Sequence, residues 1–248
     1  MAAPITHIVL ALSILPLLSP TLDKAAFIVG TSFPDIRHKA QLSRKSTHIE
    51  PVSWLEVLTC TSSFQAGMLF HNIVDIRRMD YFERYFYDRY SPWQYSSLYN
   101  DLYPLVLKMA EDIILYDRTN DWHEIISYFN AVYDEELALC PNEKLVKEWH
   151  TLLQNYCRQK PSFKTITTFL AESGGNLTIW LNSKDFDTNK TLNTLVENPY
   201  FRERLHEFYD TIKQLLNNEL LVTKPMLQHK VLVSGIPSLG LSVLAARL

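Results

Sequence analysis

Glycine is scarce in this chain, with only six residues among 248. Proteins contain roughly 7% glycine on average, and hairpin turns, dinucleotide-binding loops and barrel corners all depend on it. The chain therefore offers few positions for such structures, and its composition favours helices. Apolar residues spaced three or four apart, as at Leu69, Ile73 and Ile76, agree with this prediction because they mark one buried face of a helix.

The whole sequence is predicted to form an all-α fold, a single-domain multi-helix bundle over residues 1–248. An apolar fraction of 47% is enough for a sizeable core, and no strand-like alternation of convincing length competes with the helical periodicity. A loop is expected at Thr31–Asp35, because proline disfavours helix in the residue before it. The expected helices are Ile5–Ser19 bent at Pro16, Asp23–Val29 ended by Gly30, Trp54–Tyr87 as one helix or two in line, Gln94–Tyr116, Trp122–Leu139, Asn142–Gln159, Phe163–Glu172, Lys190–Glu197 and Tyr200–Leu221.

Two segments differ from the rest in composition. Between Tyr81 and Tyr103, ten of 23 residues are aromatic. These rings are predicted either to pack within the bundle or to border a substrate cleft. In residues 231–248 the only charge is Arg247, and Gly235 and Pro237 interrupt any helix, so this apolar tail is expected to pack on the body rather than to span a membrane.

The charge balance narrows the classes of partner. Basic and acidic residues number 24 and 27, for a net charge of -3, so no nucleic-acid groove is predicted. No apolar run is long enough for a transmembrane segment. The first basic residue is Lys24, so the positive start of a secretion signal is missing, and three widely spaced cysteines suggest no disulfide framework. We expect a cytoplasmic location; the sequence does not predict an oligomeric state.

Four of the eight histidines lie in the first 71 residues, and one of them has an acidic neighbour at helical spacing. His71 and Asp75 are four apart on a predicted helix, so their side chains project from one face and can hold one cation. Imidazole nitrogen and carboxylate oxygen are both good zinc ligands. His206 and Asp210 have the same spacing, which shows that the pair alone is weak evidence.

The order of motifs before Asp75 is more informative than the pair. The motifs are Pro4-Ile5-Thr6-His7, then Gly30-Thr31-Ser32-Phe33-Pro34-Asp35-Ile36, then Arg44-Lys45-Ser46-Thr47-His48, and finally Gly67-Met68-Leu69-Phe70-His71-Asn72-Ile73-Val74-Asp75. This order resembles the zinc-dependent phospholipase C family, which is related to the S1/P1 type nucleases. The resemblance covers about the first 80 residues and implies a compact helical bundle of that type, with metal ions in a cleft.

The resemblance also implies a metal site and a reaction. It implies that Asp35, His48, His71 and Asp75 surround one zinc, and that His7 binds a neighbouring ion shared through Asp75. The implied activity is that of a zinc-dependent phosphoesterase, a phospholipase C-like hydrolase in which a metal-activated water attacks a small-molecule or lipid phosphodiester. Asp35 is the implied catalytic residue, which orients or deprotonates that water.

The chain also departs from the family pattern. Residues 76–122 contain no histidine, and neither His123 nor His150 is followed four residues later by an acid, so a second set of family ligands has no counterpart. We therefore expect one or two ions, zinc or another divalent metal. His206 and Asp210 are a candidate replacement pair. A helical phosphohydrolase of the His-Asp type is disfavoured because no histidine here precedes an aspartate.

Simpler interpretations stay open for individual residues. His7 on an apolar helix fits a hydrogen-bonded core histidine, and Asp35 fits a cap of the short helix that follows it. Arg44 either pairs with a ligand carboxylate or is a surface charge, and His38, between Arg37 and Lys39, is expected to be solvated. The missing second set of family ligands supports the alternative function, a non-catalytic helical protein with a degenerate or structural metal site.

Overall fold

The structure is a computed structural model that describes residues 4–18, 21–49, 52–85, 97–174 and 188–233. Every regular element in these ranges is helical, which confirms the all-α prediction. The side chains of the aromatic segment Tyr81–Tyr103, and residues 234–248 of the apolar tail, lie outside the described part. The interpretations of those two segments therefore stay predictions.

The longer helices are α1 (Pro4–Ile14), α2 (Lys24–Ser32), α6 (Ser63–Tyr85), α8 (Ser97–Leu115), α11 (Glu143–Cys157), α12 (Phe163–Glu172), α14 (Thr188–Glu197) and α15 (Pro199–Val233). Shorter helices are α3 (Arg37–Ala40), α4 (Arg44–Thr47), α5 (Trp54–Thr59), α9 (Trp122–Tyr128) and α10 (Asp134–Leu139), with 3₁₀ turns at Leu15–Leu17, Phe33–Ile36 and Tyr116–Arg118.

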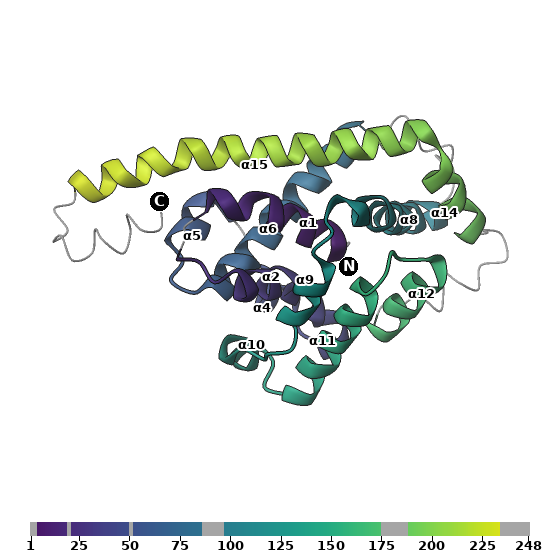
Figure 1. Cartoon of the computed structure of the whole chain (residues 1–248), viewed down its shortest axis with the longest axis horizontal. Helices are drawn as coiled ribbons and strands as arrows, with labels where there is room; N and C mark the ends of the chain where they lie inside the picture. The colour runs from purple at the N-terminus through teal and green to yellow at the C-terminus, as the bar shows by residue number, and fades with distance from the viewer. Residues whose placement is uncertain (1–3, 19–20, 50–51, 86–96, 175–187, 234–248) are drawn as a thin grey trace.

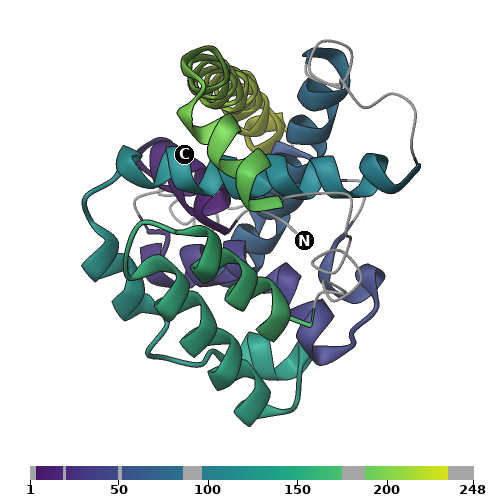
Figure 2. The same cartoon turned by 90° about the vertical axis from the view of Figure 1, so that its right-hand side faces the viewer.

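The helices form layers around α1, α2 and α6. In Figure 1, α15 runs along one side of the molecule, while α10, α11 and α12 lie on the opposite side. Figure 2 shows the same order from the end of the molecule. A hydrophobic cluster joins side chains from α1 through α15, including the fully buried Ile5, Phe27 and Phe208. None of the described helices is both long and apolar enough to cross a membrane.

The crossing of α2 and α6 is close and depends on two glycines. A Cβ atom added to Gly30 would lie 2.0 Å from the Phe64 carbonyl oxygen, and one added to Gly67 would lie 2.2 Å from the Phe27 carbonyl oxygen. Because only glycine leaves room for this approach, Gly30 serves the crossing and does not end a helix. The prediction that Gly30 stops the helix was wrong, since α2 continues to Ser32.

Other helix boundaries differ from the predictions for local reasons. The expected loop Thr31–Asp35 is the end of α2 followed by a 3₁₀ turn, in which Pro34 occupies one of the first two positions, where its missing N–H is tolerated. Of the two alternatives for Trp54–Tyr87, one helix or two, the structure has two helices, α5 and α6. The expected Trp122–Leu139 helix is also two, because a carboxylate of Glu136 caps the start of α10 at Tyr133.

Candidate metal centre

Helix α1 carries His7 into the interior. Its residues from Pro4 to Ala11 are all buried, and His7 itself is 1% exposed. An apolar helix covered on all sides is a core helix, and a polar side chain on it requires polar neighbours. Nε2 of His7 lies 3.4 Å from Oδ1 of Asp75 on α6.

Helix α6 supplies His71 and Asp75 from one face, as the spacing predicts. Nδ1 of His71 donates to the Thr31 carbonyl oxygen at 2.8 Å, at the end of α2. This bond fixes the tautomer, because a carbonyl oxygen only accepts, and leaves Nε2 as the free ring nitrogen. Nε2 is buried, has no hydrogen-bond partner among the described residues, and lies 3.6 Å from Oδ2 of Asp75.

His48 enters from the residue that follows α4. Nδ1 of His48 lies 2.9 Å from the Thr47 hydroxyl, which itself donates to the Arg44 carbonyl oxygen at 3.5 Å. The imidazole therefore donates to the hydroxyl, and Nε2 is again the free nitrogen. That nitrogen lies 3.8 Å from Oδ2 of Asp75, the oxygen that also faces His71.

Asp35 completes the cluster from the 3₁₀ turn Phe33–Ile36 and is 6% exposed. The N-cap of α3 is Ile36, so Asp35 is not the cap of that helix. Ligand atoms of Asp35, His48 and His71 lie within 4.8 Å of one another, as do those of His7, His71 and Asp75. The structure thus brings together all five residues, and their role as metal ligands stays a prediction.

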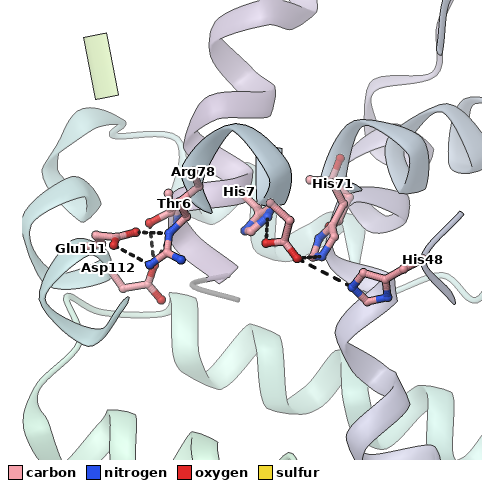
Figure 3. Close-up of polar contacts among 9 residues, drawn as sticks. Thr6, His7, His48, His71, Arg78, Glu111 and Asp112 are labelled. Carbon is pink, nitrogen blue, oxygen red and sulfur yellow. Dashed lines mark hydrogen bonds and ion pairs between the residues drawn. The ribbon is translucent and has the colours of Figure 1, made fainter. Parts of the chain in front are cut away.

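The three imidazole rings pack against one another, as Figure 3 shows. The rings of His7 and His71 are stacked, with centroids 4.2 Å apart, and the ring of His48 meets His71 edge-on at 5.2 Å. Two stacked imidazoles cannot both be protonated without strong repulsion. At most one of these two rings is therefore protonated in the absence of metal, and the neutral ring is the form that binds metal.

The electrostatics of the cluster favour neutral His7 and His48 but a protonated His71. Burial, and then the charge on His71, lower the pKa of His7, and burial followed by His71 and Arg44 lowers the pKa of His48 to about 4. Burial opposes ionisation of Asp75, but the charge on His71, together with the close approach of the His7 and His71 rings, holds the pKa of Asp75 well below the usual value. The pKa of His71 is raised, since Asp75 outweighs the effect of burial. A proton on His71 thus occupies the position that a cation would take.

The distances around Asp75 fit zinc coordination. Four ligands at about 2.1 Å in a tetrahedron lie about 3.4 Å from one another. The distances from Asp75 oxygens to the histidine nitrogens, 3.4, 3.6 and 3.8 Å, are close to that value. The donor set of imidazole and carboxylate, together with the buried Nε2 of His71, therefore fits a divalent metal.

Asp75 faces two different sets of ligands. Its Oδ1 faces His7, and its Oδ2 faces His48 and His71. His71 has one free nitrogen and can bind only one ion. The geometry therefore allows one ion among Asp35, His48, His71 and Asp75, and a second between His7 and Asp75.

Helix α8 borders this centre with charged residues that the sequence did not single out. Arg78, three residues after Asp75, donates twice to Glu111, at 2.8 and 2.6 Å, and both side chains are buried. One turn earlier on α8, Lys108 is half-buried; burial and Arg78 lower its pKa, while Asp75 and Asp35 oppose them. The three-residue spacing of Asp75 and Arg78 signals a shared face, but nothing in the sequence identifies Glu111 as the partner.

The remaining predicted residues lie in other surroundings. His206 and Asp210 belong to neither group of candidate ligands found among the described residues, and both bind Arg118 on the surface. The expectation that His38 is solvated was wrong, because the side chain is half-buried and burial lowers its pKa to about 4. His150 is a core residue paired with Glu136 at 2.7 Å.

Comparison with protein-family models, with curated proteins and with solved structures gives no match. The resemblance to the zinc-dependent phospholipase C family therefore depends on the four sequence motifs, and the family stays a prediction.

Proposed function

We propose that this chain is a zinc-dependent phosphoesterase, a phospholipase C-like hydrolase, with one or two ions held by His7, Asp35, His48, His71 and Asp75. The observation that carries the proposal is the position of Asp75. Each of its oxygens faces a different histidine set at a distance suited to shared tetrahedral coordination. Other divalent metals remain within the same proposal.

The roles of the residues follow from their contacts. Zinc, when bound, supplies Lewis acidity toward a phosphoryl oxygen and makes a water molecule more acidic. Burial opposes ionisation of Asp35, but in the metal-free protein nearby positive charge, that of His71 first, keeps the pKa of Asp35 at about 2, so this carboxylate is ionised and can orient the attacking water. The Thr31 carbonyl and the Thr47 hydroxyl hold the rings of His71 and His48 in the ligand orientation.

The proposed substrate is a small-molecule or lipid phosphodiester. The most exposed member of the cluster is Asp75, whose side chain is 24% exposed, whereas the His7, His48 and His71 side chains are each 1% exposed. A substrate would therefore approach on the Asp75 side. This depth of burial also favours a second candidate function, a non-catalytic helical protein in which the metal has a structural role.

One experiment separates the two candidates. Protein purified without a metal-binding tag is stripped with a chelator, titrated with zinc, and then assayed with bis(p-nitrophenyl) phosphate and with phosphatidylcholine vesicles. Zinc binding with turnover supports the hydrolase, and zinc binding without turnover supports the structural site. Failure of the stripped protein to bind zinc or another divalent metal contradicts both.

A further inference from the structure

The N-terminus of α1, next to His7, is held by a carboxylate from a distant part of the chain. Asp112 on α8 accepts hydrogen bonds from the Thr6 backbone N–H at 3.0 Å and from the Thr6 hydroxyl at 3.2 Å. Its other oxygen accepts from the Tyr156 hydroxyl of α11 at 2.8 Å. Thr6, Asp112 and Tyr156 are all buried, and Figure 3 shows Asp112 beside Thr6.

Asp112 takes the place of the local capping residue that accepts from backbone N–H groups at the start of most helices. Thr6 is the third residue of α1, and the first N–H groups of a helix have no acceptor within the helix. A nearby residue normally accepts from them, whereas here the acceptor is 106 positions away. Asp112 therefore holds the first turn of α1, which carries His7, against α8.

The residue before Asp112 holds the other side of the same site. Glu111 binds Arg78, which lies on α6 one turn after Asp75. Two successive carboxylates of α8 thus hold the two helices that carry His7 and Asp75. Since His7 and Asp75 face each other at 3.4 Å, a small shift of α1 changes the separation of these two ligand atoms directly.

We infer that Asp112 is a positioning residue for His7, which sets the geometry of the His7–Asp75 half of the metal centre. The consequence for zinc depends on the proposed function, but the effect on the His7 ring does not. Metal sites lose roughly 10- to 100-fold in affinity when a residue that orients a ligand is removed. Because Asp112 acts through the backbone of α1, the expected loss is about 10-fold.

The test compares two buried carboxylates that differ in what they hold. Asp112→Asn keeps the size of the side chain but replaces one acceptor oxygen with an amide NH₂ group, which only donates. Glu136→Gln is the matched control, because Glu136 is also fully buried, also accepts from a backbone N–H at a helix start, and also pairs with a buried side chain, that of His150. Both variants are expected to be less stable than the wild type.

Two measurements separate a positioning role from a merely structural one. The first is the ¹⁵N chemical shifts of the His7 and His150 rings in metal-free protein, assigned with His7→Gln and His150→Gln. The second is zinc affinity by competition with a chelating dye. We expect Asp112→Asn to shift His7 and to weaken zinc about 10-fold, and Glu136→Gln to shift only His150 and to leave zinc affinity unchanged.

The experiment distinguishes a failure of the Asp112 inference from a failure of the proposed zinc function. His7 shifts that match the wild type in Asp112→Asn would overturn the inference, whatever zinc does. A wild-type protein that binds no metal would overturn the proposed function alone, and the shifts of metal-free His7 would still decide the role of Asp112. Should Asp112→Asn not fold, Tyr156→Phe removes one donor to Asp112 and must shift His7 in a smaller, measurable way.

Discussion

At the scale of single residues, the surroundings of His71 determine which of its ring nitrogens can bind a metal. His71 uses Nδ1 on a backbone carbonyl and keeps Nε2 buried beside Asp75. His206 offers the matched comparison, since it also precedes an aspartate by four residues but binds Arg118 on the surface. Identical spacing in the sequence thus gives two different environments.

Replacing His71 by alanine is expected to abolish zinc binding at the Asp35–His48 half of the centre. A ligand that binds only the folded state stabilises it, by about 2.7 kcal/mol at 100 times the Kd, so the variant should lose the rise in Tm that zinc gives the wild type. Elemental analysis and thermal unfolding with and without zinc measure the two effects. His206→Ala is the control and should keep both metal and thermal shift; equal metal content in His71→Ala would reject the assignment.

Replacing Lys108 by alanine is expected to strengthen zinc binding. The ammonium lies within range of the Asp35 and Asp75 charges and repels a divalent cation held between them. Removing one positive charge several ångströms from an ion is worth on the order of 1 kcal/mol, or about fivefold in affinity. The measurement is zinc competition at low ionic strength, where screening is small.

The control for that variant is Lys160→Ala, which removes an exposed lysine paired with Asp117 and should leave zinc affinity as it is. Unchanged or weaker zinc binding in Lys108→Ala would show that the ammonium supports the ligand carboxylates instead of competing with the ion.

At the scale of secondary-structure elements, the sequence predicted helices well and their contacts poorly. The 3.6-residue periodicity located Phe163–Glu172 to the residue, because that helix has one buried face and a serine cap. Gly30 was misread because glycine both ends helices and permits close crossings, and the two uses look alike without the partner helix. Periodicity reports which face is buried but not what covers it.

Replacing Gly30 by alanine tests the crossing of α2 and α6. In an exposed helix this change would stabilise the protein by roughly 0.5–1 kcal/mol. Here the new Cβ would meet a backbone oxygen at 2.0 Å, so the helices must separate, and we expect destabilisation by about 3 kcal/mol. Urea unfolding gives the value, and a variant as stable as the wild type would mean that the helices do not approach so closely.

At the scale of the whole molecule, the candidate ligands could be predicted from the sequence. The residues that hold the helices carrying them, Asp112 and Glu111, could not. His7, Asp35, His48, His71 and Asp75 occur in motifs whose order is visible in the sequence, and the structure brings them together. Asp112 and Glu111 occur in no motif. They contact residues 106 and 33 positions away, and only the tertiary fold brings α8 within reach of Thr6 on α1 and Arg78 on α6. Local patterns carry no information on such pairs.

The stability of the whole molecule should depend on pH through Asp112. Burial raises its pKa to about 7, with Glu111 adding to the effect and the Thr6 and Tyr156 donors opposing it. The folded state therefore holds a proton that the unfolded chain, with an ordinary pKa near 3.8, releases. Stability from this group is present at low pH and is lost as the pH rises from about 4 to 7.

Asp112→Asn should remove that dependence. The free energy of unfolding of the variant, relative to that of the wild type, should be higher at pH 8 than at pH 5. Urea unfolding of metal-free protein at both pH values measures it. Subtracting the wild-type free energy of unfolding at each pH cancels the contributions of groups that both proteins share, including Asp35 and Asp75, whose pKa values are lowered. A difference between the two proteins that is constant with pH would show that Asp112 titrates normally.

The long-range contact of Asp112 also sets an order of events during synthesis. All five candidate ligands have been made once the chain reaches Asp75, but the residue that fixes the first turn of α1 comes later, on α8. Helix α15, which packs on α1, is later still. In a growing polypeptide the ligand set is thus complete while α1 is still uncovered, and the His7–Asp75 half of the centre takes its final geometry only after α8 has been made.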